Sequence, residues 1–158
     1  MIALPHHYQV ELSGGASGYL PTRAPGLPEL RLASPADYGG PGDAWSPEHL
    51  FVASVASCVM LTFRAVARAS KLEFSALELS AEGLLDRREG VTQFIEVTVR
   101  ARLVVKAPAE RERALRVLEK AERSCLVTAS LKTPVRLLPE IVEEKPASAP
   151  PAAADTAG

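Results

Sequence analysis

The two cysteines of the chain, Cys58 and Cys125, are its strongest candidates for chemistry. Cys58 lies in a long apolar run, and Cys125 follows a charged amphipathic stretch, so the two thiols belong to different elements. A thiol reacts as its thiolate, which needs a special environment to exist at neutral pH. Two thiols placed in this way suggest an attacking and a resolving pair. The alternative for each is a buried small hydrophobic side chain, which is common for free cysteine.

Composition describes one ordinary soluble domain. The chain has 158 residues, of which 47% are hydrophobic and 23% charged, and this is enough to build a core. The net charge of −1 and the lack of a basic run give no electrostatic case for nucleic acid or an anionic membrane. No charged region followed by an apolar stretch opens the chain, and the apolar run 50–63 is too short to span a bilayer. We expect a soluble, cytoplasmic protein.

The sequence does not indicate a metal or a cofactor. It contains neither CxxC nor HExxH, and its histidines, His6, His7 and His49, are not spaced with the cysteines as zinc ligands. In a reducing compartment both thiols stay free, and a lasting structural disulfide would be unusual. We therefore expect no bound metal and no resident cofactor.

A long helix is predicted over residues 46–70. Ser46 suits the N-cap, Pro47 is tolerated at the first helical position, and Glu48 suits the positive end of the helix dipole. Most of the helix is apolar on every side, which predicts burial on every side. One sheet of a chain this small cannot enclose such a helix, so we expect a second copy of the protein to cover it.

The remaining pattern predicts strands around two helices. An amphipathic second helix starts at Ala107 and Pro108 and ends near Cys125, with a short helical turn through Leu131. Alternation and turn residues predict strands at 8–12, 19–23, 29–33, 74–84, 94–105 and 134–142, with a hairpin turn at 86–90.

This order of elements predicts an α+β fold in which both helices pack on one antiparallel sheet. Residues 1–144 form a single domain in this prediction. Residues 145–158 are rich in proline and alanine and hold no large apolar side chain, so we expect a disordered tail.

Glu48 has two interpretations. It is a first-turn partner of the helix dipole, or it serves the thiols. Ten residues along one helix separate Glu48 from Cys58 by about 15 Å, so the two cannot meet within one chain. A self-complementary pairing of two subunits could bring them together. His49 is expected to be a surface or capping residue.

These residues carry a resemblance. Segment 45–51 with Cys58 ten residues after Glu48, the loop 38–42, and the later segment 124–127 resemble the OsmC/Ohr family of osmotically inducible and organic hydroperoxide resistance proteins. The resemblance covers residues 8–142. It implies an intertwined homodimer whose long central helices are wrapped by sheets, with active sites at the interface. It also implies that Cys58 is the peroxidatic thiol, that Cys125 is the resolving thiol, and that Glu48 positions an activating arginine.

The chain departs from this family at the arginine. The positions that hold it in the two branches of the family are occupied by Ala16 and Tyr38, while Arg23 and Arg31 are nearby but fall on no motif. The first functional hypothesis is a thiol peroxidase that reduces alkyl or lipid hydroperoxides in oxidative stress defence and is restored by an external dithiol. The alternative is a non-enzymatic dimer that binds an apolar small molecule or senses redox state.

Overall fold

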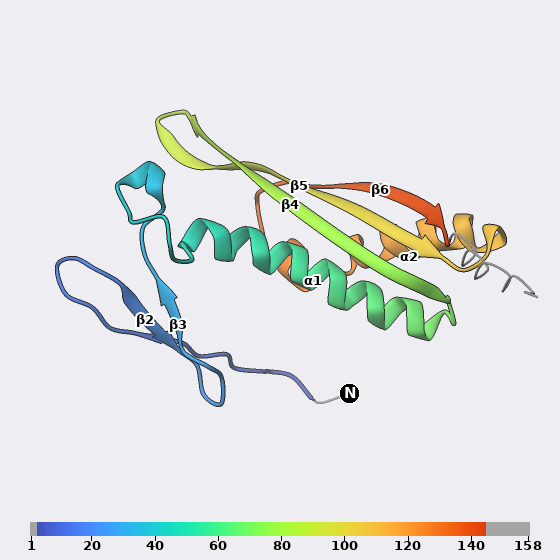
Figure 1. The fold of residues 1–158 in the computed structure, drawn as a ribbon, viewed down its shortest axis with the longest axis horizontal. Helices are drawn as coiled ribbons and strands as arrows, with labels where there is room; N and C mark the ends of the chain where they lie inside the picture. Colours follow the sequence, from blue (N-terminus) through green and yellow to red (C-terminus); the bar gives the residue numbers. More distant parts are fainter. Residues whose placement is uncertain (1–2, 145–158) are drawn as a thin grey trace, which may run out of the picture.

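The computed structural model describes residues 3–144, and the tail expected at 145–158 lies outside the described residues. Within residues 3–144, six strands form two separate sheets of three strands each. Figure 1 shows the N-terminal sheet lying apart from the main sheet, near the start of the longest helix, whereas the main sheet runs along this helix. The N-terminal sheet contains β1 (Glu11–Leu12), β2 (Leu20–Arg23) and β3 (Leu30–Leu32), and the main sheet contains β4 (Phe74–Arg88), β5 (Val91–Val105) and β6 (Val135–Glu143).

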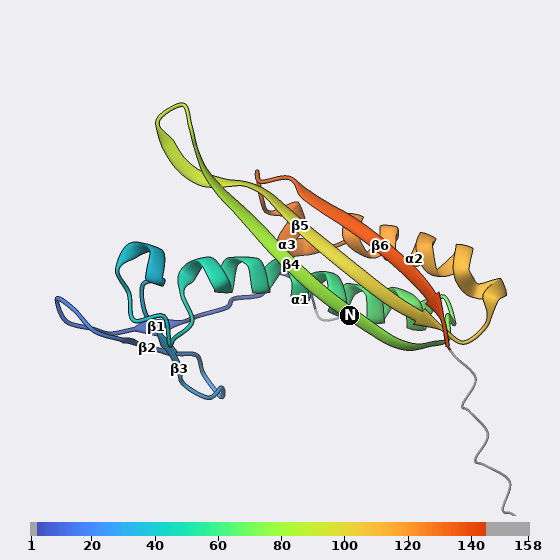
Figure 2. The ribbon, with the colours of Figure 1, turned by 45° about the horizontal axis from the view of Figure 1, so that its top comes forward.

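The helices lie on one side of the main sheet. Helix α1 (Pro47–Ala69) contacts β4, and α2 (Arg111–Arg123) contacts both α1 and β6 (Figure 2). A short helix, α3 (Leu126–Ala129), follows α2 and also contacts α1. Two 3-10 turns, η1 (Ala36–Tyr38) and η2 (Pro108–Glu110), precede α1 and α2. The predicted α+β class is confirmed.

Strand direction differs from the prediction in one place. β4 and β5 pair antiparallel, but β6 pairs parallel to β5, so the main sheet is mixed and not purely antiparallel. The chain leaves β5, passes through α2 and α3, and returns along the same direction. A crossover of this kind produces a parallel neighbour, and sequence alternation carries no information about direction.

The core of the chain lies between α1, α2 and the main sheet. Its largest fully buried side chains include Phe63 of α1, Leu103 of β5 and Leu118 of α2. Helix α1 buries only one face, through Val55, Val59, Phe63 and Ala67. Leu61, on another face of the same helix, is 61% exposed.

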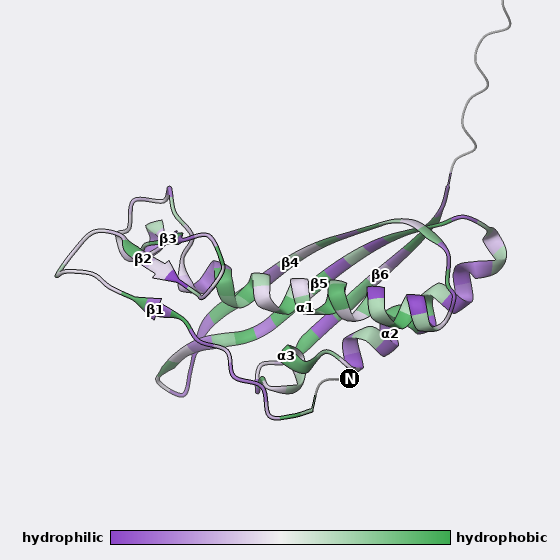
Figure 3. Cartoon of the chain, turned by 90° about the horizontal axis from the view of Figure 1, so that it is seen from below, coloured by the Kyte–Doolittle hydropathy of each residue, from purple (hydrophilic) through white to green (hydrophobic). Residues whose placement is uncertain are grey.

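Helix α1 is long and apolar enough, by length and composition alone, to cross a membrane, a test that core helices of soluble proteins also pass. Figure 3 shows hydrophobic residues along most of this helix. Its most apolar 18-residue window is only 22% buried within the chain. The expectation that one sheet cannot enclose α1 therefore agrees with the observed packing.

Candidate active site: a thiol pair between α1 and α3

The structure places the two cysteines on neighbouring helices. Cys58 lies near the middle of α1 and is half-buried, with its Sγ 4.0 Å from Oγ1 of Thr62 one turn later. Cys125 is fully buried and is the N-cap residue of α3, where its Sγ accepts the backbone N–H of Thr128 at 3.5 Å. Because α1 and α3 are in contact, the two predicted site cysteines come together.

Burial and hydrogen bonding shift the pKa values of the two thiols in opposite directions. Burial raises the pKa of the Cys58 thiol, and a hydrogen bond to Cys125 raises it further. Burial also acts to raise the pKa of Cys125, but hydrogen bonds from Cys58 and Thr128 outweigh it and leave this pKa below its ordinary value. Hydrogen bonds to a thiolate favour the charged form, whereas burial disfavours it. Within one chain, Cys125 is therefore the more acidic of the two thiols.

This order of acidity is the reverse of the one that the family resemblance implies. The accessible thiol, Cys58, keeps its proton, while the more acidic thiol, Cys125, is fully buried. Among the described residues, no cation contributes to the pKa shift of either thiol; burial and hydrogen bonds are the causes. Hydrogen bonds from Val127 and Thr62 lower the pKa of Cys58 only partly, so ready attack by this thiol would need a cation from outside residues 3–144.

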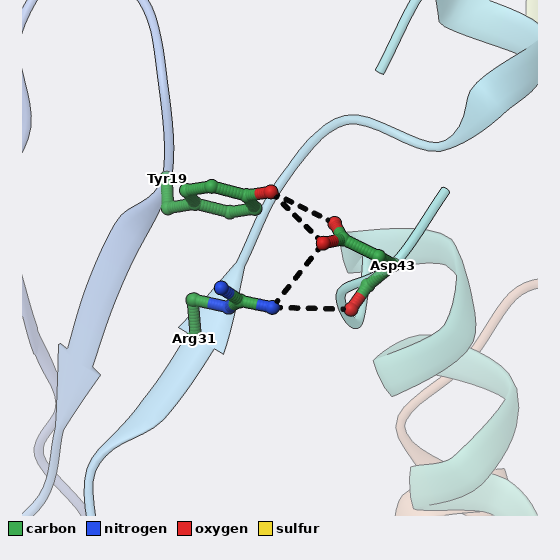
Figure 4. Close-up of polar contacts among 3 residues, drawn as sticks. All are labelled: Tyr19, Arg31 and Asp43. Carbon is green, nitrogen blue, oxygen red and sulfur yellow. Dashed lines mark hydrogen bonds and ion pairs between the residues drawn. The ribbon is translucent and has the colours of Figure 1, made fainter. Parts of the chain in front are cut away.

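The two arginines that could have replaced the family arginine are engaged in the N-terminal region. Arg23 pairs with Glu29 at 2.6 Å. Arg31 lies over the ring of Tyr19, 4.2 Å from its centroid, and contacts the Asp43 carboxylate at 3.5 Å (Figure 4). Both pairs are exposed, so each contributes little to stability. Neither arginine reaches Cys58 within the chain.

Glu48 does not join the thiol pair. It lies in the first turn of α1, and its Oε2 is buried with no hydrogen-bond partner among residues 3–144. A buried acceptor without a donor carries a desolvation penalty of about 1–3 kcal/mol. A hydrogen-bond donor from another molecule would remove this penalty.

A cavity beside Glu48 was not predicted from the sequence. It has a volume of about 420 Å³ and lies between the first turns of α1 and the strands β4 and β5. Trp45 and His49 line it together with Glu48, and their rings meet edge to face with centroids 6.3 Å apart. The signal that could have indicated it is the cluster of Trp45, Glu48 and His49 around the helix start.

A family model describing OsmC-like protein matches residues 40–138, a range that includes Glu48, Cys58 and Cys125. The chain belongs to the OsmC-like family. The resemblance inferred from the cysteine motifs is therefore confirmed.

Relatives and solved structures agree with this assignment. The uncharacterised protein YmaD of Bacillus subtilis is 27% identical over 109 residues, which are 67% of this chain and 73% of YmaD. An OsmC-like protein of unknown function from Vibrio cholerae superposes with a TM-score of 0.77 at 18% identity, over 87% of this chain and all of the other. An organic hydroperoxide resistance protein OsmC from Legionella pneumophila gives a TM-score of 0.69 at 25% identity, over 88% and 98% of the two chains.

Proposed function

We propose that this OsmC-like protein is a cytoplasmic, dimeric thiol peroxidase that reduces organic hydroperoxides in oxidative stress defence. The observation that carries the proposal is the packing of α3, whose N-cap is Cys125, against α1, the helix that carries Cys58. Membership of the OsmC-like family supports it, as does the likeness to a chain described as an organic hydroperoxide resistance protein.

The proposed reaction uses the two thiols in sequence. The Cys58 thiolate attacks the distal peroxide oxygen, so an S–O bond forms and the O–O bond breaks. The departing alkoxide takes a proton and leaves as the alcohol, while Cys58 becomes a sulfenic acid. Cys125 then condenses with this sulfenic acid to give a disulfide and water, and an external dithiol reduces the disulfide. This sequence needs no metal and no resident cofactor.

The dimer is part of the same proposal. Helix α1 leaves apolar residues such as Leu61 exposed. In the N-terminal region, Leu12 of β1 and the preceding Val10 are exposed as well. Large uncovered apolar faces in a soluble protein mark interaction sites. In this proposal a second copy covers α1, hides this surface, and supplies the donor that Glu48 lacks and the cation that Cys58 lacks among residues 3–144.

A second candidate function is favoured by a specific observation. The pKa of Cys58 is raised and no cation among residues 3–144 lowers it, which suits a dimer that binds an apolar small molecule or senses redox state without turnover. Consumption of cumene hydroperoxide with a dithiol separates the two candidates. We expect turnover by the wild type, none by Cys58→Ser, and a single oxidation without recycling by Cys125→Ser. No turnover by the wild type would refute the peroxidase.

A further inference from the structure

The two thiols differ in how far a molecule from solution can reach them. Cys125 is fully buried, whereas Cys58 on α1 is half-buried. In the proposed function a hydroperoxide must reach Cys58, so the same path is open to a small thiol. The rate of thiol–disulfide exchange depends on which sulfur the attacking thiolate can approach. Access therefore favours attack on Cys58 once the two sulfurs are joined.

The surroundings of Cys125 suit a sulfur that leaves as a thiolate. Burial disfavours the charged form of a thiol, so a buried thiolate needs hydrogen-bond donors. The Cys125 sulfur accepts the backbone N–H of Thr128 at 3.5 Å. Burial raises the pKa of both thiols, and against this effect the backbone N–H of Val127 lowers the pKa of each. Helix α3 therefore supplies two backbone donors to the Cys125 sulfur.

The side chain of Thr128 carries a third donor. Its Oγ1 is buried and has no hydrogen-bond partner among residues 3–144. The hydroxyl lies close enough to Cys125 to lower the pKa of this thiol against the effect of burial. A neutral thiol is a weak acceptor, whereas an ionised acceptor makes shorter and stronger hydrogen bonds. The hydroxyl of Thr128 would therefore gain a strong partner when Cys125 becomes a thiolate.

The Cys58 sulfur has weaker support. Among residues 3–144, the donors that lower its pKa against the effect of burial are the Val127 N–H and the Thr62 hydroxyl. Oγ1 of Thr62 lies 4.0 Å from the Cys58 sulfur, which is longer than the 3.5 Å contact at Cys125. In thiol–disulfide exchange, the sulfur whose thiolate is better stabilised leaves faster. Access and donors thus agree that Cys58 is attacked and Cys125 leaves.

We propose that the external dithiol attacks the Cys58 sulfur of the oxidised pair, and that Thr128 stabilises the departing Cys125 thiolate. The proposal rests on the proposed function, in which a hydroperoxide converts the two thiols to a disulfide. One thiolate of the dithiol forms a new S–S bond to Cys58 while the Cys58–Cys125 bond breaks. The electron pair of the broken bond goes to the Cys125 sulfur, where the N–H and the hydroxyl of Thr128 donate to it.

The second half of the exchange restores both thiols. The other thiolate of the dithiol attacks the reductant sulfur that is bonded to Cys58, so Cys58 leaves as a thiolate and the reductant becomes a cyclic disulfide. The two protons that the dithiol gave up convert the two cysteine thiolates to thiols. A monothiol lacks this ring closure, and Cys125 can attack its mixed disulfide and reform the internal bond. The arrangement therefore favours a dithiol as the reductant.

Trapping of the mixed disulfide tests the direction of attack. Diamide joins two thiols without a hydroperoxide, so the oxidised protein can be prepared whether or not the protein is a peroxidase. Brief exposure to excess glutathione is followed by an acid quench, which stops exchange by protonating thiolates, and by alkylation of the free thiols. Mass spectrometry should find glutathione on the Cys58 peptide and the alkyl group on the Cys125 peptide. Glutathione mainly on Cys125, or equally on both, would overturn the proposal.

Two matched threonine variants test the role of Thr128. Thr128→Val removes the hydroxyl and should slow reduction of the oxidised protein by dithiothreitol by roughly three- to tenfold, the effect of one lost hydrogen bond. Thr128→Ser keeps the hydroxyl and should keep most of the rate. Thr62→Val makes the same change beside Cys58 and should leave the rate unchanged, because Cys58 is the attacked sulfur. A slower Thr62→Val with an unchanged Thr128→Val would show that Cys58 leaves, and would overturn the proposal.

The proposed function and this inference fail separately. A wild type that turns over cumene hydroperoxide, but carries the trapped glutathione on Cys125, would refute the direction of attack and leave the peroxidase standing. A wild type without peroxide turnover, whose diamide-formed disulfide is opened at Cys58, would refute the peroxidase and support the direction of attack. Failure of diamide to join the two cysteines would overturn both. The trapping experiment uses the wild type alone, so it decides the direction even where Thr128→Val does not fold.

Discussion

Replacement of Leu61 by serine should weaken the proposed dimer strongly. Full burial of a leucine side chain contributes about 1.5–3 kcal/mol, and Leu61 is 61% exposed within one chain. Covering that fraction at an interface would contribute about 1–2 kcal/mol for each subunit. A two-fold interface contains the residue twice, so Leu61→Ser should cost about 2–4 kcal/mol, which raises the dissociation constant roughly 30- to 700-fold.

Light scattering and sedimentation over a range of protein concentrations measure this shift. Leu61→Met is the matched control, because it keeps an apolar side chain of similar volume and should leave the dimer intact. A wild type that is monomeric at micromolar concentration, with a cooperative melting transition, would contradict the reasoning. So would a Leu61→Ser protein that dissociates at the same concentration as the wild type.

Three further predictions concern pairs of interacting side chains. Cys58→Ala should raise the pKa of Cys125, because a hydrogen bond from Cys58 helps to lower it. Thiolate absorbance measured against pH tests this, and an unchanged Cys125 titration would contradict the pairing of the two thiols. Treatment with cumene hydroperoxide should form a disulfide between Cys58 and Cys125, which mass spectrometry under non-reducing digestion detects as one pair of joined peptides. Sulfinic acid on Cys58 together with a free Cys125 thiol would rule out Cys125 as the resolving thiol. Asp43→Asn should lower the pKa of Tyr19 toward its ordinary value, because the hydrogen bond to the Asp43 carboxylate is the main cause of the raised pKa. Phenolate absorbance measured against pH tests this, and an unchanged Tyr19 titration would contradict the contact.

Local signals explain the parts of the fold that sequence predicts well. The helix predicted at 46–70 is observed as α1 (Pro47–Ala69), with Ser46 as N-cap. A helix start depends on a few adjacent residues, and here Ser46 is the N-cap while Pro47 and Glu48 lie in the first turn. The strands predicted at 74–84 and 94–105 are longer, because polar residues extend the β4–β5 ribbon beyond the core to a two-residue turn at Glu89 and Gly90, both with positive φ.

Features that depend on long-range geometry were not predictable in this way. The parallel direction of β6 depends on the crossover through α2 and α3, not on the pattern of the strand itself. The division of the strands into two sheets depends on which partner each strand meets. The proximity of Cys58 and Cys125 was anticipated as a condition for a disulfide, but which thiol keeps the proton depends on burial and on the hydrogen bonds around each sulfur.

The two chemical parts of the site are separated within one chain, and this separation links activity to assembly. Cys58 faces Cys125 beside α3, whereas Glu48 and His49 line a cavity at the start of α1, ten residues earlier. A straight helix keeps those positions about 15 Å apart, and no rotation of a side chain closes that distance. A two-fold axis that passes beside α1 between Glu48 and Cys58 would place the start of each helix beside the middle of the other. In a folded monomeric variant such as Leu61→Ser, the proposed reaction should therefore be lost while the Cys58–Cys125 titration is retained.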